Sequence, residues 1–373
     1  MGKIESNITI CLENSSDTVS HSPATTMMQP GSKFCPLILV LMLLGGIAHC
    51  MVINLRRNGK PVLLVSFDGF RWDYLKRGLT PTFHSISVKG GSTKFIKPPF
   101  LTSTLPSHFS LVTGLHEESH GVTGSNMYDP HLNEFFTKNN NEEKWWSQRG
   151  QEPIWITNQR QGGSSGVIEF PGMGVAYGSR LPDHQYSRLD TSRSFQDLSD
   201  KAVELFANDH KVNFVALRFN EPDKTGHLHG PHSKKMNAAI AHCDKTMKHL
   251  IMRMREKNLF GKVNIIITSD HGMASTSRKR TIFAAKYLDR TAHPYFTSEN
   301  NPLLGIWPHH AEHIDPLYRA LKVAPHISVY KKADIPFRYH YRMNIRIAPI
   351  VALADKGWNL VGTKYDSLKL SDQ

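Results

Sequence analysis

The chain has little cysteine. Only four cysteines occur among its 373 residues, namely Cys11, Cys35, Cys50 and Cys243. Three of them lie in or near an N-terminal apolar segment, so the rest of the chain contains Cys243 alone. Because a disulfide framework and a thiolate metal site each need at least two cysteines, both are excluded there. Any metal site must therefore use histidine or carboxylate ligands.

The chain also lacks an internal repeat and a long block of lysine or arginine. Its formal net charge is +13, and the basic residues are spread along the sequence. This distribution is typical of a solvated basic surface. One stretch, Tyr330–Arg346, interleaves basic and aromatic residues. It would suit a nucleic-acid surface, but its isolation favours a small lid or cap subdomain, so we expect no specific nucleic-acid partner.

Long apolar runs are rare, and the most apolar stretch is Phe34–Cys50. Its dense core, Pro36–Ile47, is short for a membrane span and is followed by the small residues expected before a signal-peptidase cut. The segment predicts either a cleaved signal peptide or an uncleaved signal anchor. Arg56 and Arg57 on its C-terminal side argue mildly against the anchor. Both alternatives predict the secretory pathway and an extracellular protein, either secreted or membrane-anchored.

Three other apolar runs indicate the fold. They are Val62–Phe70, Asn213–Asp223 and Val263–Gly272, and none alternates with polar residues. Such runs are typical of parallel strands that helices cover on both faces. Ser233–Asn258 has apolar residues at helical spacing and predicts a crossover helix between the last two strands. The polar or glycine-rich stretches predict loops, and these are Lys138–Gln151 and Asn158–Ser179.

Each apolar run delivers an acidic residue near its carboxyl end. Asp68 lies near the end of the first run, Asp223 ends the second and is followed by His227, and Asp270 and His271 lie near the end of the third. Ligands of open α/β sheets bind at the carboxyl ends of the strands. A single acid there could simply cap a turn, but three acids and two imidazoles together would stay unsatisfied without cations. The set of nitrogen and carboxylate ligands suits zinc best and leaves manganese possible.

A hydroxyl group near these acids is a candidate nucleophile. In the stretch "PPFLTSTLPSHF" a helix is predicted from Pro106, with Thr104 just before it. A hydroxyl at a helix N-terminus beside a dication would have a lowered pKa, which favours attack on phosphorus. Thr104 could instead be only an N-cap. Thr102 and Ser103 are also hydroxylic, and their spacing does not choose among the three.

Four motifs together resemble a known family. They are "VSFDGFRWDYL", "TLPSHFSLVTGLHEESHGV", "NEPDKTGHLHGP" and "ITSDHGM", in this order. They resemble the ectonucleotide pyrophosphatase/phosphodiesterase family of the alkaline phosphatase superfamily, most closely its members four and five. The resemblance implies an α/β fold with a mixed, largely parallel central sheet and helices on both faces. The expected organisation is an extension without structure at 1–33, the hydrophobic segment at 34–50 and a catalytic domain at 60–373.

The resemblance also implies a two-zinc site and a mechanism. Thr104 would be the nucleophile and would form a phosphorylated intermediate. One zinc ion would be bound by Asp68, Thr104, Asp270 and His271, and the other by Asp223, His227 and a third ligand. The implied substrates are phosphodiesters or pyrophosphates of nucleotides, and in some members choline phospholipids.

The sequence departs from the family pattern at three places. The third ligand of the second zinc ion is expected just beyond Gln373, so we predict an incomplete second site and a catalytic domain without its C-terminal end. At the position where the family has the asparagine that stabilises the oxyanion, this chain has Ser125, with Asn126 beside it. Leu105 replaces an aromatic residue, and Tyr186 is the candidate for an expected tyrosine. Ser125, Asn126 and Tyr186 are therefore the predicted substrate-binding residues.

The function predicted from these observations is zinc-dependent hydrolysis of phosphodiester or pyrophosphate bonds in extracellular nucleotides. Three alternatives stay open. The chain could be a catalytically impaired family member that acts as a binding or adhesion protein, a phospholipid-directed phosphodiesterase, or a monophosphatase or sulfatase of the same superfamily.

Overall fold

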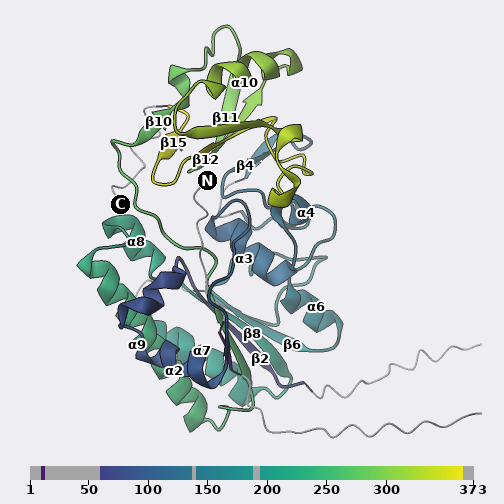
Figure 1. Cartoon of the computed structure of the whole chain (residues 1–373). Coiled ribbons are helices and arrows are strands. Elements are labelled where there is room, and N and C mark those ends of the chain that lie inside the picture. The colour runs from purple at the N-terminus through teal and green to yellow at the C-terminus, as the bar shows by residue number, and fades with distance from the viewer. Residues whose placement is uncertain (1–9, 13–58, 137–139, 188–193, 364–373) are drawn as a thin grey trace, which may run out of the picture. The chain divides into compact units, whose positions relative to one another are not determined.

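A computed structural model describes residues 10–12, 59–136, 140–187 and 194–363 (Figure 1). All of these except residues 59 and 60 belong to one structural unit. The hydrophobic segment 34–50 lies outside the described residues. Within the described part of the chain, no helix has the length and apolar character needed to cross a membrane.

A seven-stranded sheet forms the centre of this unit, in the order β3-β1-β9-β2-β8-β6-β7. The strands β9, β2, β8, β6 and β7 are parallel, and β1 runs antiparallel to β3 and β9. The sheet is therefore mixed and largely parallel, and the predicted fold class is confirmed. The strands span β1 Ile10–Leu12, β2 Val62–Phe67, β3 Gly91–Ser92, β6 Ser164–Ile168, β7 His184–Tyr186, β8 Val212–Phe219 and β9 Asn264–Thr268.

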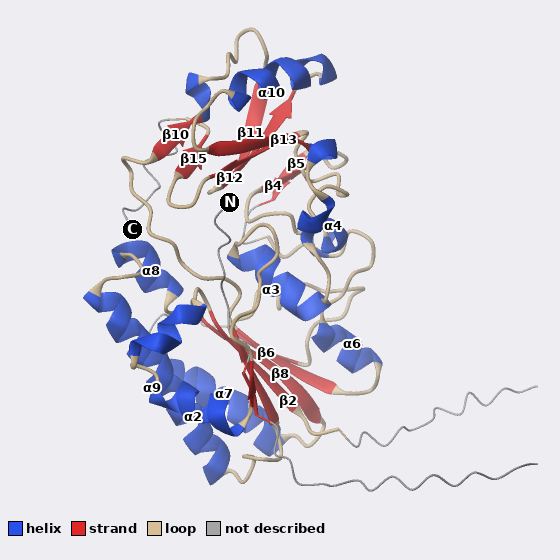
Figure 2. Ribbon diagram, viewed as in Figure 1, coloured by secondary structure: helices blue, strands red, loops and turns tan. Residues whose placement is uncertain are grey.

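Helices cover both faces of this sheet (Figure 2). Leu63 and Val65 of β2 point into a core formed with three helices, while Leu64 packs against the core on the opposite face. This alternation follows from the two-residue period of a strand and explains why the strand lacks a polar face. The first core contains α2 Pro81–Lys89, α7 Phe195–Asn208 and α9 Lys234–Glu256; the second contains α3 Thr104–Thr113 and α6 Ile154–Arg160.

The helix α9 is the predicted crossover helix. Ser233 is its N-cap and accepts a hydrogen bond from the backbone of Met236, which satisfies one of the free N–H groups of the first turn. Met236, Ile240, Met247 and Leu250 are fully buried along one side. Cys243 lies on the same side and is buried as a free thiol.

Three sequence predictions differ from the structure. The stretch Asn158–Ser179, predicted to be a loop, contains the buried strand β6, and Lys138–Gln151 contains the short helix α5, Glu143–Trp146. The serines and glycine of β6 carry no apolar pattern. A Cβ on Gly166 would come within 2.5 Å of a Leu205 methyl group, so any larger residue would require Leu205 to move. Within the extension 1–33, expected to lack structure, residues 10–12 form β1.

A second sheet lies in the C-terminal part of the chain. It is antiparallel, in the order β11-β12-β14-β13, and the helix α10 packs on one face. The other face packs against Leu101, three residues before Thr104, and against Ile335 and Tyr341. The elements are β11 Tyr295–Asn300, β12 Leu303–Pro308, α10 Ile314–Lys322, β13 Ile327–Lys331 and β14 Ile350–Ala354.

Shorter elements connect these layers. Two pairs of strands form small sheets, β4 with β5 and β10 with β15. The remaining elements are η1 Trp72–Arg77, α4 Glu117–His120, β4 Met127–Asp129, β5 Glu134–Phe136, α8 Asp223–His229, β10 Thr281–Phe283, η2 Ala284–Lys286, η3 Ala311–His313, η4 Lys332–Asp334, η5 Phe337–Tyr339 and β15 Asn359–Val361.

Candidate metal centre and nucleophile

The order of the central strands brings the predicted acids together. β9, β2 and β8 are neighbours and parallel, so their carboxyl ends lie side by side. Asp68 directly follows β2, Asp270 lies two residues beyond β9, and Asp223 is the first residue of α8. The backbone N–H of Asp223 donates to the carbonyl of Asp68 over 3.0 Å, which holds two of the acidic segments against each other.

The groups at the ends of β2 and β9 form a buried cluster. The Nε2 atom of His271 lies 3.4 Å from Oδ1 of Asp68 and 3.2 Å from Oδ2 of Asp270. Asp68 and Asp270 are 0% and 1% exposed, so water does not screen their charges. The backbone N–H of Gly69 donates to Oδ1 of Asp270 over 3.1 Å and fixes the orientation of that carboxylate.

Asp223 approaches this cluster because of Gly69. The φ angle of Gly69 is +69°, and a Cβ at this position would lie 2.8 Å from the Cβ of Asp223. Only glycine combines this backbone conformation with such a close approach. His227 follows one helical turn later, and its Nε2 atom lies 3.3 Å from Oδ1 of Asp223. Its side chain is 57% exposed, so His227 lies at the open side of the cluster.

Thr104 is the predicted nucleophile, and it lies next to the buried cluster. Its Oγ1 atom is 3.2 Å from Nε2 of His271. The helix α3 begins at Thr104, two residues before the predicted start at Pro106, and Ser103 is the N-cap residue. The alternative that Thr104 is only an N-cap is therefore wrong. Its hydroxyl is at the positive end of the helix dipole, as expected for an activated oxygen.

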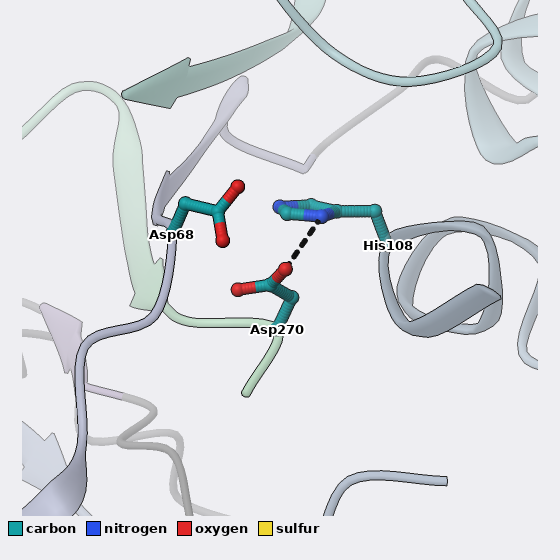
Figure 3. A group of neighbouring side chains, drawn as sticks. All are labelled: Asp68, His108 and Asp270. Atoms are coloured by element: carbon teal, nitrogen blue, oxygen red, sulfur yellow. Dashed lines mark ion pairs between the residues drawn. The ribbon is translucent and has the colours of Figure 1, made fainter. Parts of the chain in front are cut away.

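His108 is a member of the cluster that the sequence reasoning missed. Its Nδ1 atom lies 3.1 Å from Oδ2 of Asp270 (Figure 3). The same nitrogen lies 2.9 Å from the carbonyl oxygen of Thr104. Its Nε2 atom lies 2.9 Å from Oγ of Ser66 in β2. His108 is fully buried and connects the helix α3 to β2 and to the segment that follows β9. Its position one helical turn after Thr104 was the signal that could have identified it.

Arg218 is a second group that the sequence reasoning missed. It lies in β8 opposite Ser66 of β2, and its guanidinium group pairs with Asp68. The Nε atom donates to Oδ2 of Asp68 over 3.0 Å, and Nη2 donates to the same oxygen. A positive charge from the protein is thus present among the acids.

The three acids have the unsatisfied oxygen atoms that a metal ion requires. Oδ1 of Asp68, Oδ1 of Asp223 and Oδ2 of Asp270 are buried and accept no well-aligned hydrogen bond, and each has an imidazole nitrogen within 3.4 Å. Among the described residues, two overlapping groups have ligand atoms that lie within 4.8 Å of one another. They are Asp68 with His108 and Asp270, and Asp68 with Asp223 and His271. Buried oxygen and imidazole ligands at this spacing fit a divalent metal ion.

The pKa shifts of the residues in the cluster also indicate that positive charge stabilises it. Burial raises the pKa of Asp68 to about 6, and the neighbouring Asp270 adds to this effect. Burial also acts on Asp270, but His108 and His271 outweigh it and hold the pKa of Asp270 well below its usual range. Burial lowers the pKa of His271, but Asp270 and Asp68 together raise it to about 9. Cations stabilise this cluster, since each carboxylate alone would be costly to bury.

The predicted substrate-binding residues lie at different distances from the cluster. Oγ of Ser125 is 3.0 Å from Oγ of Ser103, the residue before Thr104. Asn126 is turned toward β11, because its side-chain amide donates to the carbonyl of Glu299 over 2.9 Å. Tyr186 ends the edge strand β7, three strands from β2, or about 14 Å at the usual strand spacing. Of the three residues, Ser125 is the one whose side chain contacts the residue beside Thr104.

A comparison with known proteins decides the family. The family model for type I phosphodiesterase/nucleotide pyrophosphatase matches residues 62–372. The chain belongs to this phosphodiesterase family. Human ectonucleotide pyrophosphatase/phosphodiesterase family member 5 is 40% identical over 345 residues, covering 91% of this chain and 70% of that protein. The bis(5'-adenosyl)-triphosphatase ENPP4 of Bos taurus is 36% identical over 342 residues, covering 90% of this chain and 74% of that protein.

Solved structures of this phosphodiesterase family agree with the fold. Human ectonucleotide pyrophosphatase/phosphodiesterase 5 superposes with a TM-score of 0.76 at 41% identity, covering 82% of each chain. An inactive threonine-to-alanine variant of the murine protein, in complex with AMP, has a TM-score of 0.76 at 39% identity, covering 83% of this chain and 82% of that chain. The predicted family and enzyme class are confirmed, and this phosphodiesterase is a hydrolase of a metal-dependent family.

Proposed function

We propose that this protein hydrolyses phosphodiester or pyrophosphate bonds of nucleotides with zinc as its metal and Thr104 as its nucleophile. The observation that carries this proposal is the position of the Thr104 hydroxyl, 3.2 Å from Nε2 of His271 at the edge of the buried acidic cluster. The AMP complex of the murine relative supports a nucleotide substrate for that protein, and by similarity for this one.

The residues that would hold the metal divide into two sets. Asp68, Asp270, His271 and Thr104 would hold one zinc ion, and Asp223 with His227 would hold the second. The ions would stabilise negative charge on the phosphoryl oxygens and lower the pKa of the attacking hydroxyl. The exposed side chain of His227 suits a site that opens toward the substrate, whereas Asp68, Asp270 and His271 of the first set are buried.

Thr104 would perform the bond-forming step. Its Oγ1 would attack phosphorus while the bond from phosphorus to the leaving nucleotide or alcohol breaks, and the phosphoryl group would be transferred to the threonine. Attack by water on this phosphothreonine would release the phosphoryl product and restore the hydroxyl. The fixed position of α3, which His108 ties to Asp270, keeps Oγ1 close to the ligands during both steps.

The first test compares two of the candidate hydroxyl residues, Thr104 and Thr102. A p-nitrophenyl nucleotide diester and a dinucleoside triphosphate are suitable substrates. Thr104→Ala is expected to reduce kcat by about a thousandfold or more, whereas Thr102→Ala is expected to retain activity, since only Thr104 contacts His271. Equal activity of the Thr104→Ala and Thr102→Ala variants would refute the nucleophile.

The second test concerns the metal. Dialysis against a chelator should abolish activity, and zinc should restore it. Elemental analysis of the active protein should give two zinc ions per chain. A protein that binds one ion or none and turns over no diester would instead be a binding protein that kept the fold.

We also propose that the protein enters the secretory pathway, on the basis of the apolar segment Phe34–Cys50. Expression in a secreting cell with a C-terminal tag tests this. The tagged protein should be recovered from the medium or from the cell surface, and N-terminal sequencing would reveal whether the segment is removed. Retention of the whole product in the cytosol would contradict the proposal.

A further inference from the structure

Arg218 is unusual because it places a permanent positive charge inside a cluster that requires metal ions. The neighbouring residues Leu217 and Phe219 point into the core beside α7 and α9. By the alternation of the strand, Arg218 points to the opposite face, where α3 carries Thr104. Its side chain is only 17% exposed, so its charge acts on the cluster with little screening by water.

Because of the contact with Arg218, the two oxygens of the Asp68 carboxylate have different partners. Two donors of Arg218, Nε and Nη2, converge on Oδ2. Oδ1 has no hydrogen-bond partner and lies 3.4 Å from Nε2 of His271. Asp68 therefore has one oxygen held by the protein and one oxygen directed at the other ligands.

The guanidinium group affects metal binding through its charge. Arginine remains protonated at all accessible pH values, so this charge is permanent. It balances one of the three carboxylates before any ion binds, and it repels a dication that approaches Asp68. A second ligand bond from Oδ2 of Asp68 would also require the guanidinium group to move away.

We propose that Arg218 is an internal counter-ion that holds Asp68 in the metal-free protein and weakens binding of the divalent ion. This inference rests on the proposed metal dependence of the site. Arg218 acts through Asp68 and is a positioning residue. With Arg218 in place, the site keeps its geometry without metal. It also exchanges its ion more readily than the three acids would without an arginine.

The test measures zinc affinity directly, by competition with a chromophoric chelator, in the full-length protein. Arg218→Met removes the charge at similar volume, and Arg218→Lys keeps the charge. Arg218→Met is expected to bind zinc about fivefold more tightly or better, since the guanidinium group that pairs with Asp68 repels a dication held by the same carboxylate even in water. Arg218→Lys should stay within about threefold of the unchanged protein, because the repulsion remains.

Thermal unfolding with and without zinc supplies a second readout. Without zinc, Arg218→Met should melt at a lower temperature than the unchanged protein, because the buried Asp68 then loses its arginine partner and keeps only His271 beside it. Saturating zinc should raise its melting temperature more than that of the unchanged protein. If Arg218→Met is recovered only when zinc is present during expression, the ion has replaced the arginine as the partner of Asp68, and the proposal is supported.

Three results overturn the inference in distinguishable ways. Zinc affinity of Arg218→Met that is equal to or weaker than that of the unchanged protein refutes the counter-ion role while leaving the metal site intact. Failure to recover Arg218→Met even with zinc means that Arg218 is only a structural residue. Asp270→Asn serves as the control for the site. If it binds zinc as tightly as the unchanged protein does, the proposed metal site itself is wrong.

Discussion

Replacement of Arg346 by methionine is predicted to destabilise the protein strongly. Arg346 is nearly fully buried, and its Nε donates to Oδ2 of Asp129 over 2.7 Å. Its other donors reach the carbonyl oxygens of Gly121, Trp145 and Lys144 at 3.0, 2.8 and 2.6 Å. One side chain thus joins the C-terminal part of the chain to segments more than two hundred positions earlier.

The size of the effect follows from the buried polar groups that would lose Arg346 as their partner. Breaking a buried ion pair by removing one partner typically costs about 3–5 kcal/mol. Asp129 would still accept hydrogen bonds from the backbone N–H groups of His131 and Leu132, which places the cost near the lower limit. Each carbonyl left without a donor adds about 1 kcal/mol. We therefore expect a loss of about 4–6 kcal/mol, a large share of the ~5–15 kcal/mol that stabilises a typical protein.

Urea unfolding followed by tryptophan fluorescence measures this loss. Trp145 is fully buried, and the guanidinium carbon of Arg346 lies 5.1 Å from its ring centroid, so this residue reports on the same region. At a typical slope of about 3 kcal/mol per molar urea, the midpoint should fall by more than ~1 M. The matched control is Arg338→Met at an exposed position, which should change stability by less than about 0.5 kcal/mol. Equal midpoints for the two variants would refute the reasoning.

Three further predictions concern the interior of the molecule. Burial raises the pKa of Glu117 to about 7 from 4.5, so its contribution to stability is present below pH 4.5 and lost as pH rises through 7. The free energy of unfolding of Glu117→Gln should therefore rise by up to about 3 kcal/mol relative to the unchanged protein as pH increases across this window. If the free energies of unfolding of the two proteins change with pH in the same way, the prediction is wrong. Gly69→Ala should lower the melting temperature and weaken zinc binding, because its Cβ would displace Asp223; unchanged values of both would contradict the close approach. His108→Asn should weaken zinc binding about 10- to 100-fold by releasing Asp270, and equal affinity in a chelator competition would rule this out.

The stretch Tyr330–Arg346 illustrates how composition can mislead. Its basic and aromatic residues suggested either a nucleic-acid surface or a lid. In the structure, Tyr341 is buried and donates to the carbonyl of Thr123 over 2.6 Å, and Arg346 is buried against Asp129. These residues join two parts of the molecule. Arg346 thus uses its charge inside the protein, whereas Arg338 of the same stretch is exposed, and the sequence pattern does not distinguish the two.

The sequence by itself determined the parts that depend on local pattern. The apolar runs identified the strands β2, β8 and β9, and the acids directly after them identified Asp68 and Asp270 as members of a common site. The helical period of residues 233–258 identified α9. These features are readable because strand burial, helix amphipathicity and turn chemistry act over a few neighbouring residues.

Only the tertiary structure decided which distant residues meet. The strand order that places β2 between β9 and β8 depends on packing of the whole sheet. β6 was missed because its serines and glycine are buried by their neighbours and not by their own hydrophobicity. Arg218 carries no local signal of a site, since an arginine in a strand is ordinary until a carboxylate lies against it, and the only local signal of His108 is its position one helical turn after Thr104. Their roles follow from contacts between residues separated by more than a hundred positions, and such contacts exist only once the chain has folded.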